Sequence, residues 1–245
     1  MNNEVEQDSY FDICALCGLE QTFARCSRAV RESYRCKSCQ ASLREREQAK
    51  AIILTYADVP CLTFKKLVPT PKFRELKIYE PGTIGPFRKF LKCSPNYVQS
   101  HFSPDVVDNS IRFQDLQRLD FADQSFDLII TSDIMEHVRK PEVAFREIYR
   151  VLKPGSFHIF TVPLKTSSAL KTVSRMDVSG EEDIPILPPH FHGATNGRKS
   201  LVYTDFGQDL ATSLEELNFL VKFLSPKTSS DTVNKIITII SRKPS

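Results

Sequence analysis

Four cysteines near the N-terminus form the most specific chemical pattern in the chain. They occur as two pairs, Cys14 with Cys17 and Cys36 with Cys39, in the spacing C-x2-C-x18-C-x2-C. Two residues between paired cysteines allow a tight turn to aim both sulfurs at one ion, and Gly18 supplies backbone freedom for such a turn. The pattern predicts a zinc site, which is structural because four protein ligands leave no open position for water.

Disulfide bonds are the alternative use of these four cysteines. The chain holds seven cysteines, an odd number, and Cys26, Cys61 and Cys93 have no partner at a comparable spacing. No apolar run reaches the roughly 18 residues that a membrane span requires, and the polar start MNNEVEQDS does not resemble a signal peptide. We therefore expect a cytoplasmic protein without a membrane partner, a compartment in which zinc is favoured over disulfides.

Two histidines form the second group that could do chemistry. His190 and His192 lie in PPHFHG, within a segment from Leu164 to Ser200 that is rich in Ser, Pro and Gly. Imidazole titrates near neutral pH, so either side chain could act as a catalytic base that removes a proton from a hydroxyl group. Such a long connection is typical of a loop that covers a substrate. The alternative is that both histidines only anchor the loop.

The elements that would position these groups are clearest between Ile111 and Pro163. The apolar run Phe126–Thr131 predicts a strand buried on both faces. Apolar residues then recur at helical spacing over Pro141–Leu152, and Lys153-Pro154-Gly155 should stop that helix. Phe157–Val162 predicts a second buried strand. In such a strand–helix–strand unit the ligand binds at the carboxyl ends of the strands.

The phrases FADQSFDLIITSDIMEHV and AFREIYRVLKPGSFHIFTVP within this region resemble the fourth and fifth strands of class I S-adenosylmethionine-dependent methyltransferases, in particular the type 11 group. The resemblance covers residues 77–223. It implies an α/β fold, a Rossmann-like, doubly wound sheet of seven mostly parallel strands with an antiparallel edge strand. It also implies a methyltransferase enzyme with S-adenosylmethionine as its cofactor.

The resemblance places the first cofactor contacts after an expected strand over Leu76–Glu80. Glu80, Gly82 and Gly85 match the acid and the glycine-rich turn of the family, although Ile84 and Pro86 stand where more glycine is usual. The family holds the cofactor ribose with an acid at the end of the second strand. Here His101 occupies that place, and a neutral imidazole accepts only one such hydrogen bond. We therefore expect weakened ribose binding, or its transfer to Ser100 or Asp105.

Further contacts follow from the same resemblance. Asp115 and Leu116 match the segment that meets the adenine ring, with a local turn bond as the alternative role for Asp115. Ser132 and His137 fall in the segment that lies over the cofactor, where His137 is an expected cofactor contact or an anchor for the loop.

The expected domain organisation has three parts. Residues 1–41 form a zinc-knuckle module, residues 42–70 a linking helix and connection, and residues 71–245 the methyltransferase domain. The linking helix should begin at Ser42, because Ser42 and Glu45 form a capping box. At 245 residues and 41% hydrophobic content, the chain can bury one large core beside a small appendage.

The sequence as a whole predicts methyl transfer to a small polar acceptor, with saccharides among the classes that similar proteins suggest. One alternative is a nucleic-acid methyltransferase, gripping phosphates through the basic stretch between Lys65 and Lys92. Against it, the net charge is only +3 and the long loop lacks an obvious base-reading motif such as Asn-Pro-Pro-Tyr. The other alternative is a non-catalytic binding protein, supported by the altered glycine turn and by His101.

Overall fold

The structure, a computed structural model, describes residues 8–58, 63–83, 85–102, 111–164, 171–193, 199–225 and 236–245. The chain divides into two compact units. Unit 1 comprises Met1–Glu75, Gly85–Asn96 and Leu224–Thr238, and unit 2 comprises Leu76–Ile84, Tyr97–Phe223 and Ile239–Ser245.

Unit 1 begins with an antiparallel hairpin of β1 (Ser9–Ile13) and β2 (Glu20–Ala24), followed by the short helix η1 (Val30–Glu32) and by α1 (Leu43–Tyr56). The predicted start of α1 is confirmed. The Ser42 side chain accepts a hydrogen bond from the Glu45 amide, and the Glu45 side chain accepts one from the Ser42 amide. This reciprocal pair satisfies two amides that the first helical turn would leave without partners.

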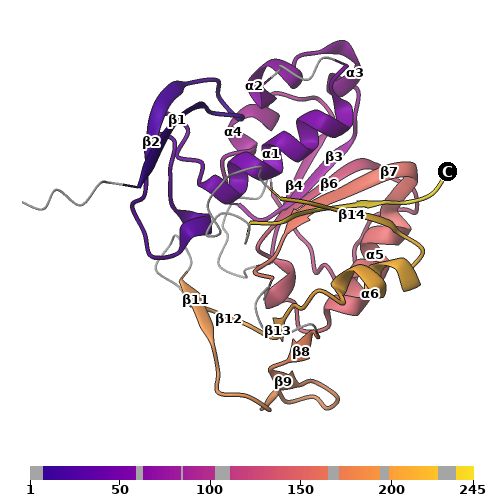
Figure 1. The fold of residues 1–245 in the computed structure, drawn as a ribbon. Helices are drawn as coiled ribbons and strands as arrows, with labels where there is room; N and C mark the ends of the chain where they lie inside the picture. The colour runs from indigo at the N-terminus through magenta and orange to yellow at the C-terminus, as the bar shows by residue number, and fades with distance from the viewer. Residues whose placement is uncertain are drawn as a thin grey trace, which may run out of the picture. The chain divides into compact units, whose positions relative to one another are not determined.

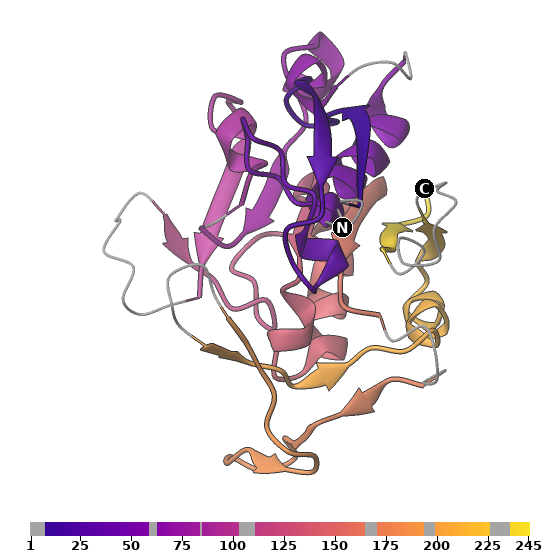
Figure 2. The same ribbon diagram turned by 60° about the vertical axis from the view of Figure 1, so that its left-hand side comes forward.

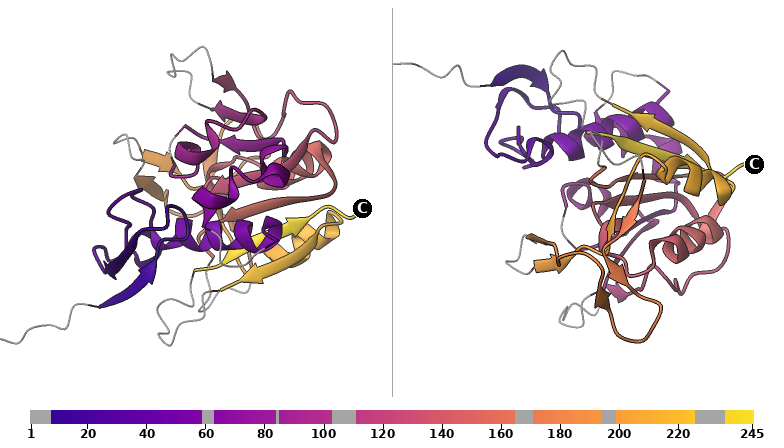
Figure 3. Two further views of the ribbon diagram at one scale, coloured as in Figure 1. Left: turned by 90° about the horizontal axis from the view of Figure 1, so that it is seen from above. Right: turned by 60° about the horizontal axis from the view of Figure 1, so that its bottom comes forward.

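A buried arginine joins α1 to the hairpin. Figure 3 draws both of these elements in indigo to purple, near the start of its colour scale. Arg46 is fully buried; its guanidinium lies 3.6 Å from the centre of the Phe23 ring on β2, and it donates to the Tyr10 hydroxyl on β1 at 2.6 Å. It also donates to the Tyr34 carbonyl. A planar guanidinium can stack on a ring and donate hydrogen bonds at its edge, and these contacts compensate the burial of this cation.

The rest of unit 1 is built on an aromatic cluster. Phe64 begins α2 (Phe64–Leu67) and makes edge-to-face contacts with Phe73 of α3 (Pro71–Arg74), and with Phe87 and Phe90 at α4 (Arg88–Leu91). The ring centres lie 5.2 to 6.1 Å apart, the spacing at which aromatic pairs attract beyond their area burial.

The central feature of unit 2 is the predicted seven-stranded sheet, whose order is β14-β15-β7-β6-β3-β4-β5 (Figure 1). The neighbours from β7 to β5 are parallel, and β15 pairs antiparallel with β7. The strands are β3 (Ile78–Pro81), β4 (Tyr97–His101), β5 (Arg112–Phe113), β6 (Phe126–Ser132), β7 (Leu152–Thr161), β14 (Leu220–Leu224) and β15 (Thr238–Arg242).

The strand–helix–strand prediction is confirmed with one correction. Helix α5 (Pro141–Val151) ends before Lys153-Pro154-Gly155, as expected, but β7 begins at Leu152 and not at Phe157. Leu152 already pairs with Phe126, and the ladder resumes at Phe157 after an irregularity. Gly155 has φ +79° in this interval, a conformation that lets the chain bulge without leaving the sheet.

The segment after β7 contains more regular structure than its composition predicts. Its short strands form three antiparallel pairs, β8 with β13, β9 with β10 and β11 with β12, which lie together in Figure 2. Their bounds are β8 (Val173–Ser174), β9 (Met176–Asp177), β10 (Ile184–Pro185), β11 (Phe191–Gly193), β12 (Lys199–Leu201) and β13 (Thr204–Asp205). Leucines recur at helical spacing over Tyr203–Asn218 and predict a helix there. The observed helix, α6 (Leu210–Glu216), is shorter, because Thr204 and Asp205 pair with β8 instead.

No helix among the described residues is long and apolar enough to cross a membrane.

The core of unit 2 contains a histidine that titrates far from its usual range. His158 on β7 is fully buried, stacks on Phe160 at 4.3 Å between ring centres, and its Nε2 lies 2.9 Å from the Thr131 hydroxyl on β6. Burial disfavours the imidazolium and lowers the pKa of His158 to about 3.

We expect His158 to make the fold acid-sensitive. Between the unfolded pKa of 6.5 and the folded pKa of about 3, the unfolded chain binds the extra proton, so stability is complete above this window and falls as pH falls through it. His158→Gln should remove about 1.4 kcal/mol per pH unit from the slope of unfolding free energy against pH below 6.5. Urea titrations at several pH values measure this slope. The exposed His190→Gln is the matched control, and equal slopes in both variants would contradict the assignment.

Candidate functional site

The four predicted metal-ligating cysteines come together in unit 1. All four sulfurs lie within 4.8 Å of one another, with Cys14 and Cys39 at 3.6 Å and Cys17 and Cys36 at 3.5 Å. A disulfide needs about 2.05 Å between its sulfurs, whereas a tetrahedral zinc ion with bonds of about 2.3 Å separates them by about 3.8 Å. The arrangement therefore fits a four-thiolate metal site and not two disulfides.

The two cysteine turns share one backbone design. In the first, the amide of Gly18 donates to the Cys14 carbonyl; in the second, the amide of Gln40 donates to the Cys36 carbonyl. Both Gly18 and Gln40 have positive φ, at +84° and +66°. The second turn thus carries a side chain in the left-handed region where the first has glycine, a conformation that the residue type does not indicate.

Neighbouring elements of unit 1 brace these turns. The amides of Phe64 and Lys65 at the start of α2 donate to the carbonyls of Ala15 and Leu16, and Lys89 donates through its ammonium group to the Cys39 carbonyl at 3.0 Å. The cysteine segment is therefore integrated with the helices that follow it.

The residues of unit 2 that are predicted to contact the cofactor lie at the carboxyl ends of its strands. Glu80 on β3 is buried, and its carboxylate accepts a hydrogen bond from the Tyr97 hydroxyl at 2.6 Å. Gly82 follows β3 with φ +98°, and a Cβ placed there would meet nothing closer than Ile134, at 3.7 Å. Gly85, which belongs to unit 1, has φ +154°.

His101 is the last residue of β4. Its ring meets the edge of Phe113 at 5.9 Å, and its Nδ1 is buried with no hydrogen-bond partner among the described residues. An imidazole nitrogen left in this state costs free energy that a hydroxyl or amide donor would recover. Asp105 lies outside the described residues.

Asp115 follows β5 and makes the local turn bond that was its alternative role. Its Oδ1 accepts from the backbone amide of Gln117 at 2.9 Å and from the Gln117 side chain at 3.1 Å. The neighbouring Leu116 is buried. The adenine contact of both residues remains a prediction.

The end of β6 carries a strained connection. Ser132 is the last strand residue, and Asp133 follows with φ +51°, a left-handed conformation that is uncommon outside glycine. The Asp133 amide donates to the Thr161 carbonyl at 3.0 Å, and the Thr161 hydroxyl donates to the Asp133 carboxylate at 2.9 Å. The ends of β6 and β7 are therefore tied together where the ligand site of the fold is expected.

Directly after this connection, the helix η2 (Met135–His137) meets the β11 strand. The Oε1 atom of Glu136 lies 3.8 Å from Nε2 of His137 and 3.7 Å from Nδ1 of His192. The His192 ring makes edge-to-face contacts with both His137 and His190, each at 5.0 Å between ring centres. Three predicted site histidines are thus brought together. His137 and His192 lie beside the Glu136 carboxylate, which was not among the predicted site residues, and His190 lies beside His192.

Glu136 is not among the predicted site residues, although Ser132 and His137 on either side of it are. The sequence feature that could have indicated it is an acid beside a histidine, shortly after a buried strand. Only the folded chain shows its importance, because the Glu136 side chain is 1% exposed and faces residues more than fifty positions away.

His137 has a fixed protonation pattern. Its Nδ1 lies 2.7 Å from the Leu201 carbonyl on β12, so this nitrogen must carry the hydrogen. Burial lowers the pKa of His137, a shift that the Leu201 hydrogen bond opposes. His137 therefore anchors β12 to η2, the loop-orienting role that the sequence had left open.

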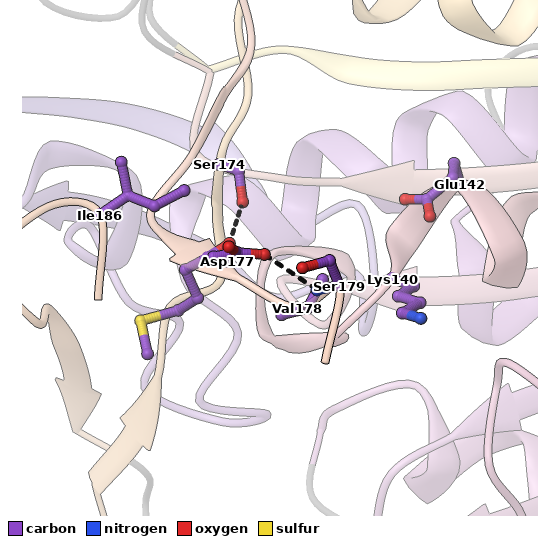
Figure 4. A pocket seen from close by; sticks show the side chains of 8 residues that line it. Lys140, Glu142, Ser174, Asp177, Val178, Ser179 and Ile186 are labelled. Carbon is purple, nitrogen blue, oxygen red and sulfur yellow. Dashed lines mark hydrogen bonds between the residues drawn. The ribbon is translucent and has the colours of Figure 1, made fainter. Parts of the chain in front are cut away.

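A separate hollow of about 400 Å³ opens between the start of α5 and the β8–β9 segment (Figure 4). Figure 4 shows Asp177 bound to Ser179 at its floor, with Lys140, Glu142 and Ile186 at its margins. The hollow includes none of the predicted site residues.

The chain is similar to known methyltransferases over part of its length. A family described as "Methyltransferase domain", the type 11 group, matches residues 90–160. A S-adenosylmethionine-dependent methyltransferase from Methanosarcina mazei is 16% identical, with a TM-score of 0.41, over 70% of this chain and 93% of its own. Another from Mesorhizobium loti is 15% identical, with a TM-score of 0.42, over 69% of this chain and 91% of its own. No curated protein matches the chain.

The family match spans β4, β5, β6 and most of β7 within the seven-stranded sheet. The four-cysteine cluster near the N-terminus lies outside the matched residues.

We expect purified protein to contain one zinc ion at the cysteine cluster. Cys36→Ser should abolish this binding and lower the melting temperature, because a structural metal contributes directly to folding. Elemental analysis and thermal unfolding of both proteins measure the effect. Cys93→Ser, which changes an exposed cysteine, is the matched control. Unchanged zinc content and melting temperature in Cys36→Ser would contradict a structural zinc site.

Proposed function

We propose that this protein transfers the methyl group of S-adenosylmethionine to a small polar acceptor, with saccharides as one candidate class. The supporting observation is the convergence of polar groups at the carboxyl ends of β3, β4 and β6, where open α/β sheets bind ligands. The histidines of the β11 segment reach the same strand ends through η2.

The residues present are compatible with the methyl donor. Gly82 leaves room for close approach of a ligand to the backbone, and the buried Nδ1 of His101 is suited to accept one ribose hydroxyl. Asp115 and Leu116 are the proposed adenine contacts, while Glu80, Gly85, Ser132 and His137 are further proposed donor contacts. When bound, the donor supplies a methyl group activated by its positive sulfur.

The chain's contribution to the reaction is alignment, exclusion of water and proton transfer. His190 or His192 is the proposed catalytic base, taking the acceptor's proton on a ring nitrogen. Glu136, 3.7 Å from His192, would stabilise the imidazolium that forms. His190 contacts the same His192 ring and is exposed, so it can reach an acceptor from solvent.

The basic stretch does not favour nucleic acid as the acceptor. Lys89 is bound to the Cys39 carbonyl, and Lys72 pairs with Asp58 at 3.3 Å. These contacts give two members of the stretch local roles. The non-catalytic alternative is tested directly by donor binding.

We expect measurable donor binding that improves in His101→Asp. A carboxylate accepts both ribose hydroxyls with charge-assisted bonds, which should tighten binding by about 1 kcal/mol, or roughly fivefold. Asp115→Ala should weaken binding by about 1.5–3 kcal/mol if its carboxylate holds the adenine amino group. Isothermal titration calorimetry measures both, with the exposed Asp177→Ala as a control outside the proposed site. Weaker binding in His101→Asp would refute the placement of the ribose, and the absence of binding in all proteins would favour the non-catalytic alternative.

We expect the loop histidines to affect turnover rather than donor affinity. Loss of the catalytic base should lower the single-turnover rate by on the order of 10²–10⁴ in His190→Ala or His192→Ala, with the donor dissociation constant unchanged. Mass spectrometry of cell extract incubated with isotope-labelled donor first identifies the acceptor for this assay. Small, equal rate effects in both variants would assign the two histidines to loop anchoring.

A further inference from the structure

Three metal-ligating side chains of unit 2 converge at the end of β6, apart from the cysteine cluster. They are Glu136 and His137 of η2 and His192 of β11, and one ligand atom of each lies within 4.8 Å of the other two. The carboxylate oxygen is the shared member, at 3.8 Å from Nε2 of His137 and 3.7 Å from Nδ1 of His192.

The hydrogen bond from His137 to Leu201 determines which nitrogen of the His137 ring can bind a ligand. Because its Nδ1 donates to the Leu201 carbonyl, the neutral ring presents a bare lone pair at Nε2. That lone pair faces the Glu136 oxygen, also an acceptor. Two acceptors facing each other repel unless a proton or a cation lies between them. A hydrogen bond from the far nitrogen of an imidazole to a carbonyl is also how metal-binding histidines are commonly held in place.

The surrounding backbone fixes the three residues relative to one another. The Tyr203 amide donates to the Glu136 carbonyl at 2.8 Å, and β12 pairs with β11 so that His192 lies opposite Ser200. The strand that fixes the His137 ring is thus the partner of the strand that carries His192. Backbone hydrogen bonds therefore set the positions of the residues that carry the three side chains.

We propose that Glu136, His137 and His192 bind a divalent transition-metal ion. With bonds of about 2.1 Å, tetrahedral ligand atoms lie about 3.4 Å apart, so the observed distances of 3.7 and 3.8 Å close with small side-chain movements.

Two imidazoles and one carboxylate suit zinc, cobalt or iron, whereas four thiolates select zinc more strongly. Three protein ligands leave at least one coordination position open, in contrast to the cysteine cluster. If the proposed methyl transfer is also correct, His192 is engaged by the metal and His190 is the imidazole that remains for proton transfer.

Cobalt titration of the zinc-loaded full-length protein tests the site. Protein is first loaded with one equivalent of zinc, which cobalt does not displace from thiolates because zinc binds such sites more tightly. Cobalt is then added, and its visible absorption is followed. We expect one cobalt ion per chain, with a spectrum of nitrogen and oxygen ligands and no thiolate-to-cobalt charge-transfer band.

Two variants test the ligands. Glu136→Gln keeps the side-chain size, and His192→Ala changes a residue whose side chain is one-third exposed. Circular dichroism checks that each variant is folded. Each should raise the cobalt dissociation constant at least tenfold. His190→Ala, beside His192 but outside the ligand set, and the exposed Glu142→Gln should leave it unchanged.

The measurement contains neither donor nor acceptor, so it is independent of the proposed function. The absence of a second metal ion would overturn the proposal and leave a proton shared between Glu136 and the histidines. Binding that is equally strong in Glu136→Gln and His192→Ala would overturn it as well.

Discussion

The parallel pairing of β6 with both β3 and β7 is the constraint on which the rest of unit 2 depends. Leu128 of β6 lies opposite Ile78 of β3 and Phe157 of β7, and all of β6 from Leu128 to Thr131 is buried. Parallel strands that are buried on both faces must be apolar along their length. Apart from buried groups such as His158 of β7, their polar residues lie at the ends, and the parallel direction gathers the carboxyl ends at one edge.

The segment of β11 and β12, which carries His192, is held at that edge by hydrogen bonds to η2 rather than by its own apolar packing. Leu201 and Tyr203 bind the side chain of His137 and the main chain of Glu136, while Phe191 and Ile186 remain exposed. A segment with few buried apolar side chains has little stability of its own. Its position is set by η2, which in turn is set by the end of β6. Chemistry at His190 and His192 is thus coupled to the geometry of the central strand.

Unit 1 is stabilised by different interactions. Its cysteine turns are stabilised by hydrogen bonds from α2 and Lys89 and by the proposed metal. The buried Arg46 then fastens the hairpin to α1 through Phe23 and Tyr10. A desolvated cation that stacks and donates hydrogen bonds is specific in its geometry, so this contact fixes the hairpin more strictly than an apolar contact of equal area.

The sequence alone determined the features that depend on local spacing. Each of these features depends on residues that lie close together in the chain: the cysteine pairs, the capping box at Ser42, the strand Phe126–Thr131 and the helix that follows it. The seven-stranded sheet was expected from the resemblance to the type 11 group. Tertiary structure alone decided the rest. Pairing with Phe126 moved the start of β7 to Leu152, and pairing with β8 shortened α6. The partnership of Glu136 with His192 joins residues that no local pattern relates, because it arises from strand ends and a hairpin that meet only when the chain is folded.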